Sequence, residues 1–192
     1  MIVPVGRWVI AEAARQQRAW RRDGLYPPRI SVNVSAVQFR ENHLLEEVRK
    51  ASDSSPGECE LEFEITESVL MGNDVAAAAS LRSIRDLGVE ISIDDFGTGY
   101  SSLSRLHSLP ISTLKIDRSF IDGMTDDVNK TEIVSTIISL AQTLRLKVIA
   151  EGVETEQQAK LLQSLRCDEI QGFLVARPMP PDEVANWLQA SP

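Results

Sequence analysis

The stretch ISIDDFGTGYSSL, residues 91–103, decides how the rest of the chain is organised. Ile91 and Ile93 alternate with polar residues, and this period of two predicts a β-strand. The strand ends on two adjacent carboxylates, Asp94 and Asp95. The glycine-bearing loop that follows lets the backbone turn sharply and approach a ligand closely. Such an acidic pair suits a divalent cation, although a simple surface turn explains these residues equally well when they are taken alone.

The composition is typical of a globular domain. The chain has 192 residues, of which 43% are hydrophobic and 25% charged, enough for one domain with a sizeable core. The net charge of −8 argues against a nonspecific DNA or RNA binder, which needs a basic face. No apolar run approaches the length of a membrane span, and the first residues do not resemble a signal peptide. We expect a single cytoplasmic domain over residues 1–192, with Cys59 and Cys167 as reduced thiols.

Strands and helices alternate along the chain. The pattern predicts six strands, near residues 29–34, 59–65, 89–95, 113–116, 147–150 and 168–174. The expected helices cover residues 5–22, 44–51, 75–86, 101–106, 131–144, 156–165 and 181–190. This order predicts parallel strands with right-handed crossovers. The spacing is that of a (β/α)8 barrel lacking about two leading strands. An open doubly wound sheet is the alternative, but no Gly-x-Gly-x-x-Gly follows the first strand.

The first and fifth of these helices show a clear apolar face. In the first helix the residues expected to face the core are Val5, Val9 and Ala13, with Trp8 and Trp20 packing beside them. In the helix over residues 131–144 they are Ile133, Ile137, Ile138 and Ala141.

Polar side chains stand at the carboxyl end of every predicted strand. They are Asn33, Glu64 with Glu67, Asp94 with Asp95, Lys115, Glu151 with Glu154, and Gln171. In a barrel these strand ends converge on the face where barrel enzymes carry out their chemistry. The donors are oxygens, without cysteine or histidine, which suits magnesium, manganese or calcium rather than zinc. A phosphate ester is the expected substrate, because two metals can bind its oxygens and activate a water.

The motifs SVNVSAVQF, FEITES, IDDFGTGYSSL, LKIDRSFI, VIAEGVET and QGF…RPMP occur in this order. Together they resemble the EAL-domain cyclic-di-GMP phosphodiesterases, and the resemblance extends over residues 3–180. It implies a barrel that hydrolyses cyclic di-GMP to linear pGpG with magnesium or manganese, in bacterial second-messenger signalling.

The resemblance also implies a role for each strand-end residue. The metal ligands matched by position are Asn33, Glu64, Asp94, Asp95 and Glu151. The matched catalytic residues are Lys115, Glu151 and Asp95. The residues expected to line the site or to support the loop after Asp95 are Glu67, Glu154, Gln171, Gly97, Thr98 and Ser101. That loop is further expected to take part in a homodimer.

The Glu-Ala-Leu motif of the family is absent from this sequence. In the family it lies upstream of the segment that matches residues 1–8, and its glutamate is a metal ligand. We therefore expect an N-terminally truncated domain, with an incomplete two-metal site and weakened activity. Two alternatives are an impaired regulatory module that binds cyclic di-GMP or a protein, and a fragment without function. The parent protein is expected to carry a fused sensor or GGDEF-type domain.

Overall fold

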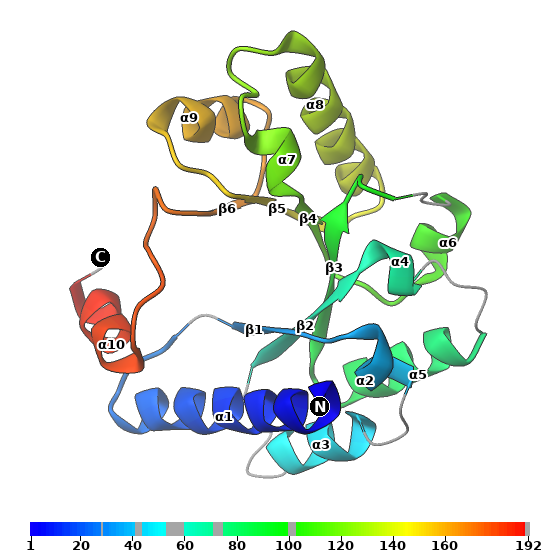
Figure 1. Cartoon of the computed structure of the whole chain (residues 1–192), viewed down its shortest axis with the longest axis vertical. Coiled ribbons are helices and arrows are strands. Elements are labelled where there is room, and N and C mark those ends of the chain that lie inside the picture. The colour runs from blue at the N-terminus through cyan, green and yellow to red at the C-terminus, as the bar shows by residue number, and fades with distance from the viewer. Residues whose placement is uncertain (28, 41–43, 53–59, 71–74, 100–102, 191–192) are drawn as a thin grey trace. The chain divides into compact units, whose positions relative to one another are not determined.

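The computed structural model describes residues 1–27, 29–40, 44–52, 60–70, 75–99 and 103–190 (Figure 1). Six strands form a sheet in chain order: β1 (Ile30–Asn33), β2 (Leu61–Thr66), β3 (Glu90–Phe96), β4 (Thr113–Ile116), β5 (Lys147–Glu151) and β6 (Glu169–Gln171). β1 pairs with β2, and β3, β4, β5 and β6 pair in succession, all in parallel. The six predicted strands are confirmed, and each overlaps the residues expected for it.

Helices separate the strands. They are α1 (Ile2–Arg22), α2 (Ala36–Arg40), α3 (Leu44–Ser52), α4 (Glu67–Leu70), α5 (Val75–Asp86), α6 (Leu103–Ser108), α7 (Arg118–Ile121), α8 (Val128–Thr143), α9 (Glu156–Ser164) and α10 (Pro181–Ala190). The short helices α2 and α4 were not predicted, because one turn leaves too few positions for a periodic pattern. Among the described residues, no helix is both long and apolar enough to span a bilayer.

The chain divides into two compact units. Unit 1 comprises Met1–Ile65, Asn73–Ile91 and Pro178–Pro192, and unit 2 comprises Thr66–Gly72 and Ser92–Arg177. In unit 1, α1 packs against α2, α3 and β1. In unit 2, α7 and α8 pack against β5, and α8 also contacts β4.

The buried face of α1 differs from the predicted one. The buried residues are Gly6, Ile10, Ala14 and Gln17, each one or more positions away from the expected set. Val5 and Trp8, predicted to face the core, are 53% and 65% exposed. Trp20 is half-buried and donates from its indole Nε1 to the carbonyl oxygen of Pro181 at 3.3 Å.

Two residues explain why apolar periodicity misplaced this face. Gly6 presents only backbone, which lets the Gln38 side chain lie directly against it. Gln17 is polar but fully buried, because its amide donates to the carbonyl of Glu60 at 3.0 Å and accepts from the same residue's N–H at 2.7 Å. A glycine and a hydrogen-bonded glutamine therefore occupy core positions that an apolar pattern does not register.

A substitution at Gly6 tests this packing. A Cβ there would lie 1.7 Å from Nε2 of Gln38, whose Oε1 accepts from the Ser35 hydroxyl at 2.7 Å. Gly6→Ala is therefore expected to lower the free energy of unfolding by about 1–3 kcal/mol, as overpacking does, although alanine favours helix. Urea denaturation measures the change. Trp8→Ala on the exposed face is the control, and its free energy of unfolding is expected to stay within about 0.5 kcal/mol of wild type. A larger loss in Trp8→Ala than in Gly6→Ala would contradict the observed buried face of α1.

β2 is buried on both faces, as is common in parallel sheets. Its residues from Leu61 to Ile65 are all buried, including Glu62 and Glu64. Glu62 accepts from the Arg29 guanidinium at 3.5 Å and from the Ser31 hydroxyl at 3.4 Å. The alternation of apolar and acidic residues thus identified the strand, while the acidic side chains are held inside by polar partners.

Unit 2 is organised around β4, which is buried throughout. The buried residues of α8 are Val134, Ile137, Ile138 and Ala141, whereas Ile133, predicted to face the core, is 42% exposed. The helix α9 is capped by Thr155, which forms a capping box with Gln158. Cys167 is a free thiol, and burial raises its pKa to about 11, so it stays protonated at neutral pH. Cys59 lies outside the described residues.

Candidate metal centre

Asp94 and Asp95 lie at a bulge in β3. Residues 93–96 of β3 lie opposite residues 114–116 of β4, so β3 carries one extra residue here. Asp95 has a left-handed backbone with φ of 53°, a conformation that aspartate adopts more readily than most residues. Neighbouring side chains of a regular strand point to opposite faces. The bulge instead allows both carboxylates to join one cluster.

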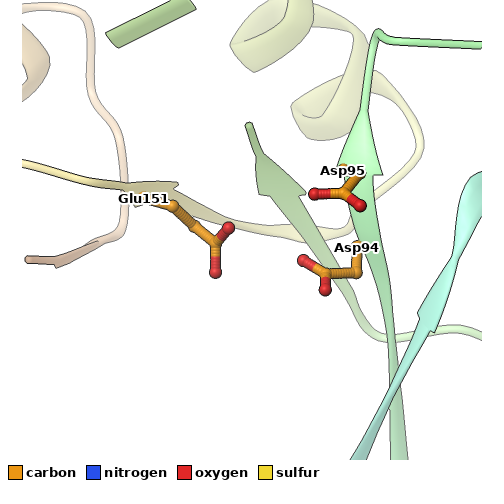
Figure 2. A group of neighbouring side chains, drawn as sticks. All are labelled: Asp94, Asp95 and Glu151. Atoms are coloured by element: carbon orange, nitrogen blue, oxygen red, sulfur yellow. The ribbon is translucent and has the colours of Figure 1, made fainter. Parts of the chain in front are cut away.

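The cluster consists of Asp94, Asp95 and Glu151, the last residue of β5 (Figure 2). One carboxylate oxygen from each lies within 4.8 Å of the others. Figure 2 shows the side chains of Asp94 and Glu151 pointing toward one another from β3 and β5. Both are largely buried, with side-chain exposures of 13% and 18%. Three acidic groups at this separation repel one another unless a cation neutralises them.

Lys115 supplies a positive charge beside the cluster. It lies in β4, between the strands that carry the carboxylates, and its side chain is 2% exposed. Its Nζ is 2.5 Å from Oε1 of Glu151 and 3.9 Å from Oδ1 of Asp94. One ammonium compensates one of three carboxylates, so the centre remains suited to further positive charge.

The residues present fit a divalent cation. Oδ1 of Asp94 is buried and has no hydrogen-bond partner among the residues that the structure describes. The Lys115 ammonium, at 3.9 Å, is too far away to donate a hydrogen bond to it. A buried carboxylate oxygen without a hydrogen bond is costly, and native structures rarely leave one unless an ion or water satisfies it. Carboxylate oxygens are the ligands that magnesium and manganese prefer. Asp94, Asp95 and Glu151 are therefore the side chains that would hold such an ion.

The environment of Asp95 disfavours its negative charge. Burial raises the pKa of the Asp95 carboxyl above its ordinary value, and repulsion from Asp94 and Asp117 adds to the rise, while Lys115 opposes it. Between the ordinary and the raised pKa, the folded chain binds more protons than the unfolded chain. Stability therefore falls as pH rises through this window. At neutral pH the ionised Asp95 opposes folding until a cation neutralises it.

Asp95→Asn is accordingly expected to raise the thermal midpoint of the metal-free chain at neutral pH. Asparagine tolerates the left-handed backbone and removes the charge repulsion between residue 95 and its acidic neighbours. The rise in thermal midpoint is small because solvent screens the partly exposed Asp95 carboxylate. Melting curves in EDTA measure it, and the gain should shrink in acid, where the wild-type carboxyl is protonated. Asp126→Asn, at an exposed position, should show no such pH dependence. A variant less stable than wild type at neutral pH would contradict the assignment.

In unit 1, two further predicted ligands form a pair. Nδ2 of Asn33 donates to Oε2 of Glu64 at 3.0 Å, and the two residues are register partners in β1 and β2. Glu64 is 7% exposed. The pair presents carboxylate and amide oxygens at two neighbouring strand ends.

The start of the loop after β3 is held from two directions. Glu67, the first residue of α4, is 2% exposed, and its Oε2 accepts from the Gly97 N–H at 3.1 Å. The Thr98 hydroxyl donates to the carbonyl of Asp95 at 2.8 Å. Ser101, also predicted to support the loop, lies outside the described residues.

The other predicted site residues are exposed, and two residues beside them were missed. Glu154 and Gln171 are exposed, and Glu154 accepts from Nη2 of Arg118 at 2.8 Å. Asp117 helps to raise the pKa of the Asp95 carboxyl through charge repulsion. Asp117 and Arg118 follow β4 directly. A set of strand-end residues that extends two positions past Ile116 would include Asp117 and Arg118.

Comparison with known proteins places these residues in a family. The family model of the EAL domain matches residues 1–178. The chain is 47% identical over 185 residues to the bifunctional diguanylate cyclase/cyclic di-GMP phosphodiesterase MucR of Pseudomonas aeruginosa, covering 96% of this chain and 27% of that protein. The chain spans about a quarter of the length of the curated relatives it matches.

Two solved structures have the same fold. The PaMucR phosphodiesterase in complex with c-di-GMP gives a TM-score of 0.89 at 47% identity, covering 95% of this chain and 74% of that chain. The EAL domain of Mycobacterium smegmatis DcpA gives a TM-score of 0.91 at 37% identity, covering 98% of this chain and 85% of that chain. These likenesses confirm the predicted fold class, a partial (β/α) barrel.

Proposed function

Because this chain belongs to the EAL-domain family, we propose that it acts in a bacterial signalling protein as a phosphodiesterase domain that hydrolyses cyclic di-GMP to linear pGpG. The observation that carries the proposal is the cluster of Asp94, Asp95 and Glu151, in which a buried Asp94 oxygen has no hydrogen-bond partner among the described residues. A relative of 47% identity solved in complex with c-di-GMP supports the choice of ligand. Magnesium or manganese is the proposed ion, in a two-metal arrangement.

The residues of the site have different roles in the proposed hydrolysis. In the reaction, water adds to one phosphorus, one P–O ester bond breaks, and the leaving oxygen takes up a proton. Bound cations would supply Lewis-acid stabilisation of the phosphate oxygens. Asp94, Asp95 and Glu151 each place one carboxylate oxygen within 4.8 Å of the other two. The Lys115 ammonium, held by Glu151, can donate a hydrogen bond to a phosphate oxygen or orient the attacking water.

Several expectations from the sequence stay predictions. The proposal includes Asn33 and Glu64 as metal ligands and a homodimer formed through the loop after Asp95. It also includes a cytoplasmic location and a fused sensor or GGDEF-type domain. The relatives that extend well beyond the matched segment are consistent with fusion to further domains.

The proposed function is tested by incubating the purified chain with cyclic di-GMP and manganese and separating the nucleotides by chromatography. Asp94→Asn serves as the loss-of-function variant and Asp126→Asn as the matched exposed control. Appearance of pGpG in the wild type and in Asp126→Asn, but not in Asp94→Asn, supports a hydrolase. Cyclic di-GMP that is bound and recovered intact would replace the hydrolase by a regulatory binding module. A folded chain that neither binds nor cleaves cyclic di-GMP would overturn the proposal.

A further inference from the structure

Arg118 lies across the backbone that follows β5. Gly152 has φ of 70°, and a Cβ at this position would lie 2.3 Å from Cγ of Arg118 and 2.8 Å from its Cβ and Cδ. The aliphatic part of Arg118 therefore packs directly on the Gly152 backbone. Its guanidinium continues to Glu154, where Nη2 donates to Oε1 at 2.8 Å. One side chain thus contacts both ends of segment 152–154.

Residues other than Arg118 also constrain this segment. Val153 is fully buried, and its N–H donates to the carbonyl of Gln171 at 3.0 Å. A Cβ on Gly172 would lie 2.1 Å from the carbonyl oxygen of Val153, so the two backbones touch. The N–H of Glu154 donates to Oε1 of Gln158 at 2.8 Å. Segment 152–154 is therefore held by Arg118 together with residues of β6, the loop that follows it, and α9.

The segment begins immediately after Glu151, the carboxylate that β5 contributes to the metal centre. We propose that Arg118 is a positioning residue, which holds segment 152–154 so that the Glu151 carboxylate points toward Asp94. This inference rests on the proposed function. Arg118 and Glu154 are 59% and 41% exposed, and ion pairs at such exposure contribute little to global stability. The effect of the pair is therefore expected locally, in the geometry of the centre.

Arginine suits this role better than lysine. Its stem covers the glycine while the planar guanidinium presents donors in fixed directions. Residues that orient a metal ligand from behind commonly change metal affinity or activity about 10–100-fold when they are removed. A direct contact between the Arg118 guanidinium and a substrate phosphate is the competing explanation, and it predicts a different result.

The test compares Arg118→Ala and Arg118→Lys with wild type in three measurements on the whole chain. Hydrogen–deuterium exchange reports on the amides of Val153 and Glu154. Electron paramagnetic resonance gives the manganese affinity without nucleotide. Steady-state kinetics gives kcat and KM for cyclic di-GMP. Arg15→Ala is the matched control, because Arg15 forms a similarly exposed pair with Glu12 at 2.6 Å, with exposures of 57% and 37%.

Arg118→Ala is expected to speed exchange at both amides and to weaken manganese binding about 10-fold, with the loss mainly in kcat. Arg118→Lys should recover part of each, and Arg15→Ala should change none. Unchanged exchange and affinity in Arg118→Ala would overturn the inference. A rise confined to KM would overturn it in favour of direct phosphate contact. Faster exchange in Arg118→Ala, together with a wild-type chain that binds no manganese, would overturn the proposed function and the orienting role with it.

Discussion

Lys115→Met is expected to lower the free energy of unfolding of the metal-free chain by about 3–5 kcal/mol, the usual cost of removing one partner from a buried charge pair. The Lys115 side chain is 2% exposed, and its Nζ lies 2.5 Å from Glu151 and 3.9 Å from Asp94. Methionine nearly fills the same volume but removes the positive charge that pairs with both carboxylates. Chemical denaturation in EDTA, followed by circular dichroism, measures the loss.

The same variant distinguishes charge from packing. Manganese should restore much of the lost stability, because the ion supplies positive charge where the ammonium was. Lys147→Met is the matched control: Lys147 pairs with Glu169 at 3.0 Å, but the two side chains are 59% and 51% exposed. Its cost should be about 0–1 kcal/mol. If Lys115→Met were as stable as wild type in EDTA, the buried ion pair would have no role in holding the carboxylates.

Asp94→Asn is expected to abolish stabilisation of the chain by manganese. A ligand at 100 times its dissociation constant stabilises the folded state by about 2.7 kcal/mol, or roughly 5–10 °C in the melting temperature of a domain of this size. The wild type should show a shift of this order. Asparagine keeps the shape of Asp94 but removes the negative charge of this carboxylate, whose buried Oδ1 has no hydrogen bond within the described part of the chain.

Thermal melts at increasing manganese concentration measure this effect. Asp126→Asn, which changes an exposed aspartate outside the cluster, should retain the full wild-type shift. An Asp94→Asn chain that manganese stabilises as strongly as the wild type would show that the ion binds elsewhere.

The sheet could be predicted because each strand carries a local pattern. A period of two identifies strands such as residues 113–116 without tertiary information, because Leu114 and Ile116 alternate with the polar residues Thr113 and Lys115. The oxygen-donor character of the centre follows from the residue types at the strand ends. The proximity of Asp94 and Glu151 could be expected from parallel strands in a barrel, because their carboxyl ends share one edge.

Other features depend on contacts that sequence patterns do not encode. Two adjacent aspartates in a regular strand would diverge, and only the bulge with its left-handed Asp95 lets both join the cluster. The core face of α1 was misplaced because Gly6 and Gln17 are buried through a close approach and a pair of hydrogen bonds. Arg118 was missed because its significance arises from Gly152, which lies on another strand's end.

The central claim is that Asp94, Asp95 and Glu151 form a divalent-cation centre. Anomalous diffraction from crystals of this chain grown with manganese tests it most directly. The account predicts an anomalous peak about 2.0–2.2 Å from a carboxylate oxygen of each of these three residues. A well-ordered cluster without a peak, in crystals where manganese occupies another position, would contradict it.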